Sequence, residues 1–71
     1  MTTLTARIVG PVRYLGADGE DRSIPLGPCL IERLDDQSVD IFWGALGQSS
    51  AAVPMQEVVA ARESGRLVLL G

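Results

Sequence analysis

The stretch SVDIFWG, residues 38–44, alternates apolar and polar side chains in the way that is typical of a β-strand with one buried face. Val39, Ile41 and Trp43 fall on one side of this strand, and Phe42 falls on the other, beside a charged residue. The alternation therefore predicts that Trp43 points into the core. It leaves open what covers the ring of Phe42.

Short strands separated by turns are predicted on both sides of this stretch. Residues 35–37, Asp-Asp-Gln, are polar and few enough to reverse the chain, so residues 29–34 and 39–43 are predicted to form a hairpin. Asp18 and Gly19 supply the backbone freedom that another tight turn needs. Further short strands are expected at residues 4–9, 12–15, 22–26 and 51–53.

The spacing of apolar residues changes from two to about 3.6 over residues 54–64, which predicts a helix. Val58 and Val59 are expected to be buried on its apolar face, and Gly65 is expected to end it. Residues 66–70 follow, and apolar side chains from this segment would fall on both faces of a strand. They are predicted to form a last strand that is buried on both faces.

Taken together, these segments predict a mainly β fold with one helix before the last strand, in a single globular domain spanning residues 1–71. In layout this order resembles small barrels or strongly bent antiparallel sheets of the SH3-like kind. The resemblance rests on the order of elements alone and implies no residue correspondence and no function. The alternative is an α+β split sheet with the helix packed across one face.

The composition bears on the class of partner. Hydrophobic residues make up 46% of the 71 residues, which is rich for so small a domain and suggests that another chain covers some apolar surface. The net charge of −3 and the isoelectric point near 4.6 argue against nucleic acid or an anionic membrane as a partner. All six basic residues are arginine, which we interpret as the codon bias of a GC-rich bacterial genome.

The inventory of reactive side chains is small. Histidine is absent, so the usual general base near neutral pH is missing. The single cysteine, Cys29, excludes an intrachain disulfide and cannot alone form a zinc site. We therefore expect no catalytic residue, metal or cofactor, and the sequence favours a binding protein over an enzyme. A cytoplasmic location is expected, because no signal peptide or membrane-spanning run is found.

Four residues are candidates for an interaction surface. Exposed aromatic and arginine side chains are common anchors of protein contacts, and Phe42 is predicted to lie on the outer face of its strand. Arg7 and Arg13 share a parity across a Gly-Pro break, and Arg33 belongs to a neighbouring strand, so the three are candidates for an anion-binding patch. The alternatives are that the arginines pair with nearby carboxylates and that Phe42 packs under a loop or the helix.

These features predict a small bacterial interaction or regulatory module that acts by binding and self-association. The alternative is a small-molecule-binding or enzymatic subunit whose pocket forms between copies in an oligomer, with Trp43 and Tyr14 as candidate lining residues. At least a homodimer is expected, because both the last strand and the Phe42 face present apolar surface that a chain of this size has little means to cover. A second protein is a further candidate partner.

Overall fold

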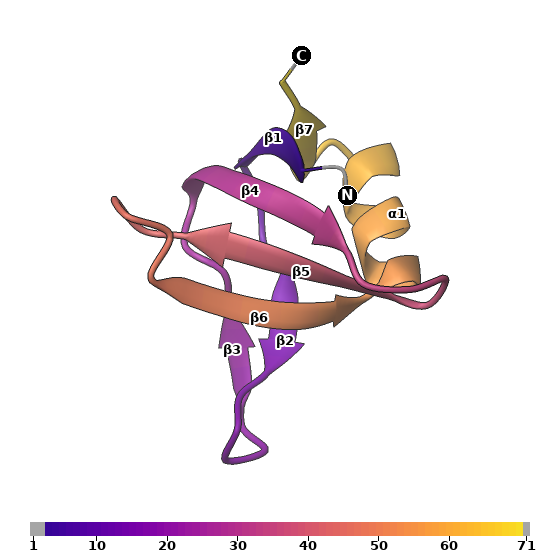
Figure 1. The fold of residues 1–71 in the computed structure, drawn as a ribbon. Helices are drawn as coiled ribbons and strands as arrows, with labels where there is room; N and C mark the ends of the chain where they lie inside the picture. The colour runs from indigo at the N-terminus through magenta and orange to yellow at the C-terminus, as the bar shows by residue number, and fades with distance from the viewer. Residues whose placement is uncertain (1–2, 71) are drawn as a thin grey trace.

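The computed structural model of the chain describes residues 3–70, which form seven strands and one helix. The strands are β1 (Thr3–Ile8), β2 (Arg13–Leu15), β3 (Asp21–Ser23), β4 (Gly27–Arg33), β5 (Ser38–Trp43), β6 (Ser49–Pro54) and β7 (Leu67–Leu69), and the helix is α1 (Met55–Glu63). Five strands form an antiparallel sheet in the order β6-β5-β4-β1-β7, and β2 and β3 form a separate hairpin (Figure 1). The predicted mainly β fold, with one helix before the last strand, is confirmed.

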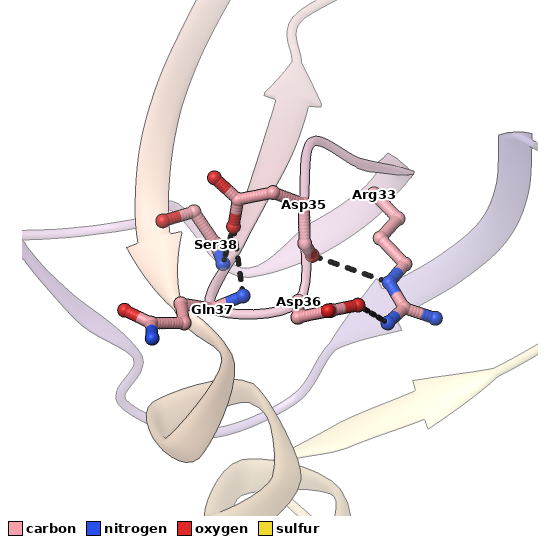
Figure 2. Close-up of polar contacts among 5 residues, drawn as sticks. All are labelled: Arg33, Asp35, Asp36, Gln37 and Ser38. Atoms are coloured by element: carbon pink, nitrogen blue, oxygen red, sulfur yellow. Dashed lines mark hydrogen bonds and ion pairs between the residues drawn. The ribbon is translucent and has the colours of Figure 1, made fainter.

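The β4–β5 hairpin has the register that the alternating pattern predicts. Ile31 lies opposite Ile41, and both side chains are buried on the same face. Asp35 holds the turn, because its carboxylate accepts the backbone N–H groups of Gln37 at 2.7 Å and Ser38 at 2.8 Å (Figure 2). An aspartate at this position thus supplies acceptors for donors that the reversal leaves outside the sheet ladder.

The core lies on one face of the five-stranded sheet, which α1 and the β2–β3 hairpin cover. In Figure 1, β4, β5 and β6 lie in front, and the hairpin passes behind β6 and extends below it. Val12 and Ile24 flank the hairpin strands and are buried, and the N–H of Ile24 donates to the carbonyl of Val12 at 2.9 Å. The five-stranded sheet contributes the buried residues Ala6, Ile8, Cys29, Ile31, Val39, Ile41, Val53 and Leu67.

The last strand is not buried on both faces, so that prediction is wrong. β7 is an edge of the sheet and pairs with β1 alone among the described strands. Leu67 points into the core, whereas Val68 points to the opposite face and is 43% exposed. The other edge is β6, and the two edges do not pair with each other, so the sheet stays open and does not close into a barrel.

The helix packs through a different residue from the one predicted. Ala61 is fully buried, whereas Val58 is only partly buried and Val59 is 45% exposed, so the expectation that both valines are buried is wrong. A small side chain lets the helix backbone approach the sheet closely, and the bulkier valines then lie to one side of the contact. α1 has nine residues, and no helix within residues 3–70 is long and apolar enough to cross a membrane.

Candidate binding surfaces

A cleft of about 560 Å³ opens between α1 and the core face of the sheet; we call it the helix–sheet cleft. Three aliphatic side chains on its wall are exposed, namely Leu4 at 44%, Leu34 at 51% and Val59 at 45%. They come from β1, the β4–β5 turn and α1. The complete lining consists of Leu4, Ile31, Arg33, Leu34, Asp35, Asp36, Val39, Met55, Val58, Val59, Arg62, Leu67 and Leu69.

The polar groups of the helix–sheet cleft differ in how they are paired. Arg33 is bound within the β4–β5 turn, since Nη2 donates to Oδ1 of Asp36 at 2.6 Å and Nε donates to the carbonyl of Asp35 at 3.2 Å (Figure 2). Arg62 forms no ion pair with any residue from 3 to 70. The positive charge of Arg62 is therefore available to a bound group beside an aliphatic wall.

A second surface is the face of the sheet away from α1, which we call the outer face. At its centre, Leu30 of β4 lies opposite Phe42 of β5, and Leu30 is 43% exposed while Phe42 is partly buried. Arg7 lies to one side of this pair, and Glu32 and Asp40 lie to the other. The predicted outward orientation of Phe42 places it here, beside a groove that the β5–β6 loop borders.

The arginines proposed as one patch are not brought together. Arg7 lies on the outer face, opposite Pro28 and Val68. Arg33 has the core-face parity of its strand and lines the helix–sheet cleft, and Arg13 lies on the separate hairpin. The alternation of side chains between the two faces of a strand does not continue from Arg7 to Arg13. The reason is that β1 ends at Ile8 and the chain leaves the sheet before β2 begins.

The two residues proposed as pocket lining are in contact. The ring centroids of Tyr14 and Trp43 are 5.6 Å apart, with an angle of 54° between the ring planes. The pair packs the β2–β3 hairpin against the sheet, and such tilted aromatic contacts stabilise beyond their buried area. Within one copy the two rings border different clefts, because Trp43 lies beside Phe42 and Leu46 whereas Tyr14 lies beside Ala52.

The acidic hairpin tip and the cysteine are accounted for by local structure. The carboxylate of Asp18 accepts the N–H of Glu20 at 3.1 Å and pairs with Arg22 at 2.7 Å, and these contacts lower the pKa of Asp18. Within residues 3–70 no group of three or more His, Cys, Asp or Glu side chains could hold a metal ion. Burial raises the pKa of the Cys29 thiol, so the thiol is protonated at neutral pH.

No family model, curated protein or solved structure matches the chain. The function is therefore inferred from the helix–sheet cleft and the outer face. Sequence reasoning identified the outer face through Phe42 but missed the helix–sheet cleft. One signal was present: Leu34 is the last residue of a predicted strand, directly before a polar turn, and no partner is predicted for its aliphatic side chain.

Proposed function

We propose that the chain is a small bacterial, cytoplasmic protein-binding module, which holds aliphatic side chains of a partner protein in the helix–sheet cleft and also self-associates. The observation that carries the proposal is the aliphatic wall formed by Leu4, Leu34 and Val59, which three separate elements leave exposed around one cleft. Contiguous exposed apolar surface of this kind marks interaction sites in small soluble domains.

The charge at the cleft favours a particular kind of partner. Arg33 is engaged by Asp36, so Arg62 is the arginine of the lining that has no described ion partner. A peptide with an aliphatic side chain next to a carboxylate satisfies both the wall and this charge. An aliphatic-acidic segment of a partner protein is therefore the occupant we expect.

The alternative, a small-molecule or enzymatic subunit with a pocket between copies, has weaker support. Tyr14 and Trp43 contact each other and border separate clefts in one copy, so a shared pocket needs a second chain to complete it. The SH3-like layout adds only an analogy of element order, because a fold does not determine a function. Shifts of thermal midpoint across a metabolite panel would favour this alternative.

A peptide library displayed on phage and selected against the folded protein tests the proposal. We expect selected peptides to be enriched in aliphatic and acidic residues and to shift the backbone amide signals of Leu4, Leu34 and Val59 in NMR spectra. Val59→Asp should abolish binding, because it places a charge in the aliphatic wall. Ala60→Asp is the matched control, since Ala60 is exposed and is not part of the cleft lining.

Selected peptides that bind Val59→Asp and the parent chain equally well would place the binding site elsewhere. Arg62→Glu tests the contribution of the charge separately from that of the aliphatic wall. It should weaken acidic peptides by about fivefold while leaving peptides with neutral flanking residues unchanged, as expected for one charge pair of about 1 kcal/mol.

A further inference from the structure

We infer that the outer face is a two-fold interface between two copies of this chain, in which Arg7 of each copy pairs with Glu32 and Asp40 of the other. The inference rests on the self-association in the proposed function and names the surface that performs it. It does not involve the helix–sheet cleft, which lies on the opposite side of the sheet.

The outer face consists of three parallel rows of side chains that cross the strands. The middle row is Thr5, Leu30, Phe42 and Ser50, which lie opposite one another on β1, β4, β5 and β6. One flanking row is Val68, Arg7 and Pro28, and the other is Thr3, Glu32, Asp40 and Ala52. The face thus has an apolar centre, a cation on one side and two carboxylates on the other.

The charged groups of the outer face are unpaired within the described part of one copy. Arg7, Glu32 and Asp40 form no ion pair with any residue from 3 to 70. Glu32 and Asp40 moreover lie directly opposite each other on neighbouring strands. Like charges in such a cross-strand pair destabilise a sheet. A cation brought by another chain would relieve this repulsion.

A second copy supplies that cation by symmetry. Residues in adjacent rows are two positions apart along a strand, which is about 7 Å, so Arg7 and the acidic pair lie at similar distances on either side of the middle row. A two-fold axis lying in the interface along the middle row exchanges the two flanking rows. It places Arg7 of each copy over the acidic row of the other, and Leu30 and Phe42 over their own counterparts.

The lateral offset between the paired charges is within reach. Arg7 is on β1, and Glu32 is on the adjacent strand β4, about 5 Å away across the sheet. Stacked sheets commonly cross at about 30°, which moves the flanking rows sideways relative to each other. The long, flexible arginine side chain accommodates the remaining offset.

The size of the face sets the expected affinity range. Five strands about 4.8 Å apart and about six residues long cover a projected area near 400 Å². This is less than the roughly 800 Å² per partner of a standard stable interface, so we expect a weak dimer, with a Kd of micromolar or above. Measurements should therefore reach about 1 mM protein.

Charge reversal with complementary variants tests the interface. Arg7→Glu alone, and Glu32→Arg combined with Asp40→Arg, should each be monomeric at concentrations where the parent chain is dimeric. An equimolar mixture of the two variants should form a heterodimer, because every proposed pair then joins opposite charges again. Sedimentation velocity measures the species, and circular dichroism reports whether each variant is folded. Arg13→Glu changes the net charge as Arg7→Glu does, lies off this face, and should stay dimeric.

The possible outcomes distinguish this particular interface from self-association in general. A parent dimer that persists in Arg7→Glu, or two folded monomeric variants that fail to associate when mixed, would overturn this interface while leaving self-association intact. A parent chain that is monomeric up to about 1 mM would overturn both this interface and self-association. Peptide binding at the helix–sheet cleft is measured separately, so neither result bears on it.

Discussion

Arg66 connects segments that are distant in the sequence. Its Nη1 donates to the carbonyl of Pro11 at 2.7 Å, and its Nε donates to the hydroxyl of Ser64 at 2.7 Å. Its backbone carbonyl accepts the N–H of Gly10 at 3.1 Å. A side chain at Gly10 would approach Cγ of Arg66 to within 2.7 Å, so this close crossing requires glycine. The end of β1 is thereby fixed to the turn that precedes β7.

Arg66→Lys should destabilise the protein by about 1 kcal/mol, although the charge is kept. A lysine ammonium cannot donate in the two directions that the guanidinium uses to reach Pro11 and Ser64. Urea unfolding followed by Trp43 fluorescence measures the change. Arg62→Lys is the control, because Arg62 is exposed and should tolerate the replacement. Equal urea midpoints for the two variants would show that Arg66 is not a structural connector.

Cys29 should react slowly with a disulfide reagent at pH 8 in the folded protein and rapidly in concentrated urea. The side chain is buried, and burial raises its pKa, so the reactive thiolate is scarce in the folded state. A raised pKa also means that the protonated thiol contributes stability below its ordinary pKa. This contribution is lost as the pH rises through the folded-state pKa. Equal reaction rates in both states would place the thiol at the surface.

At the scale of elements, β5 was predictable because its alternation is unambiguous. Val39→Asp should unfold the protein, since it puts an unpaired charge on the buried face beside Ile41. Asp40→Ala should change the free energy of unfolding by less than about 0.5 kcal/mol, because Asp40 lies on the outer face. Circular dichroism compares the two variants. Similar stability for both would contradict the register of this strand.

The contact of α1 with the sheet was not predictable from hydropathy. Valine ranks above alanine as a core residue, yet Ala61 is fully buried and Val59 is exposed, since close backbone approach favours the smaller side chain. The prediction that β7 is buried on both faces was wrong for a related reason. Its apolar composition suggests two buried faces, but nothing local to Leu67 or Val68 reveals that the strand lies at an edge. In both elements, the residues that are buried are determined by tertiary neighbours.

Ala61→Leu should cost about 1 to 3 kcal/mol of stability, because the added methylenes have no space between α1 and the sheet. Ala60→Leu is the matched control at the preceding position, where the side chain is exposed and leucine, a good helix former, is tolerated. Thermal unfolding by circular dichroism compares the variants. A Tm for Ala61→Leu at or above that of Ala60→Leu would contradict the proposed packing.

Across the whole molecule, one candidate site was predictable from the sequence and the others were not. Phe42 was assigned to an outward face from parity alone, and its position on the outer face agrees. The grouping of Arg7 with Arg33 failed, because the sequence does not show that they lie on opposite faces of the sheet. The helix–sheet cleft was missed altogether, since it forms only where β1, β4, α1 and β7 meet.

A chain of 71 residues with one helix has little means of covering both faces of a five-stranded sheet. The structure covers the core face and leaves Leu30, Phe42 and Val68 on the other. Pairing of two copies would bury this apolar centre and add stability that depends on protein concentration. We therefore expect the chain to self-associate through the outer face.

Sedimentation equilibrium of the untagged protein, from low micromolar to about 1 mM, measures this self-association. We expect a reversible dimer of about 15 kDa, twice the 7.5 kDa of one chain, with the dimer fraction rising with concentration. Phe42→Asp should be monomeric, and Leu15→Asp, at an exposed position on the hairpin, should still dimerise. A single 7.5 kDa species at every concentration of the unaltered chain would exclude self-association through the outer face.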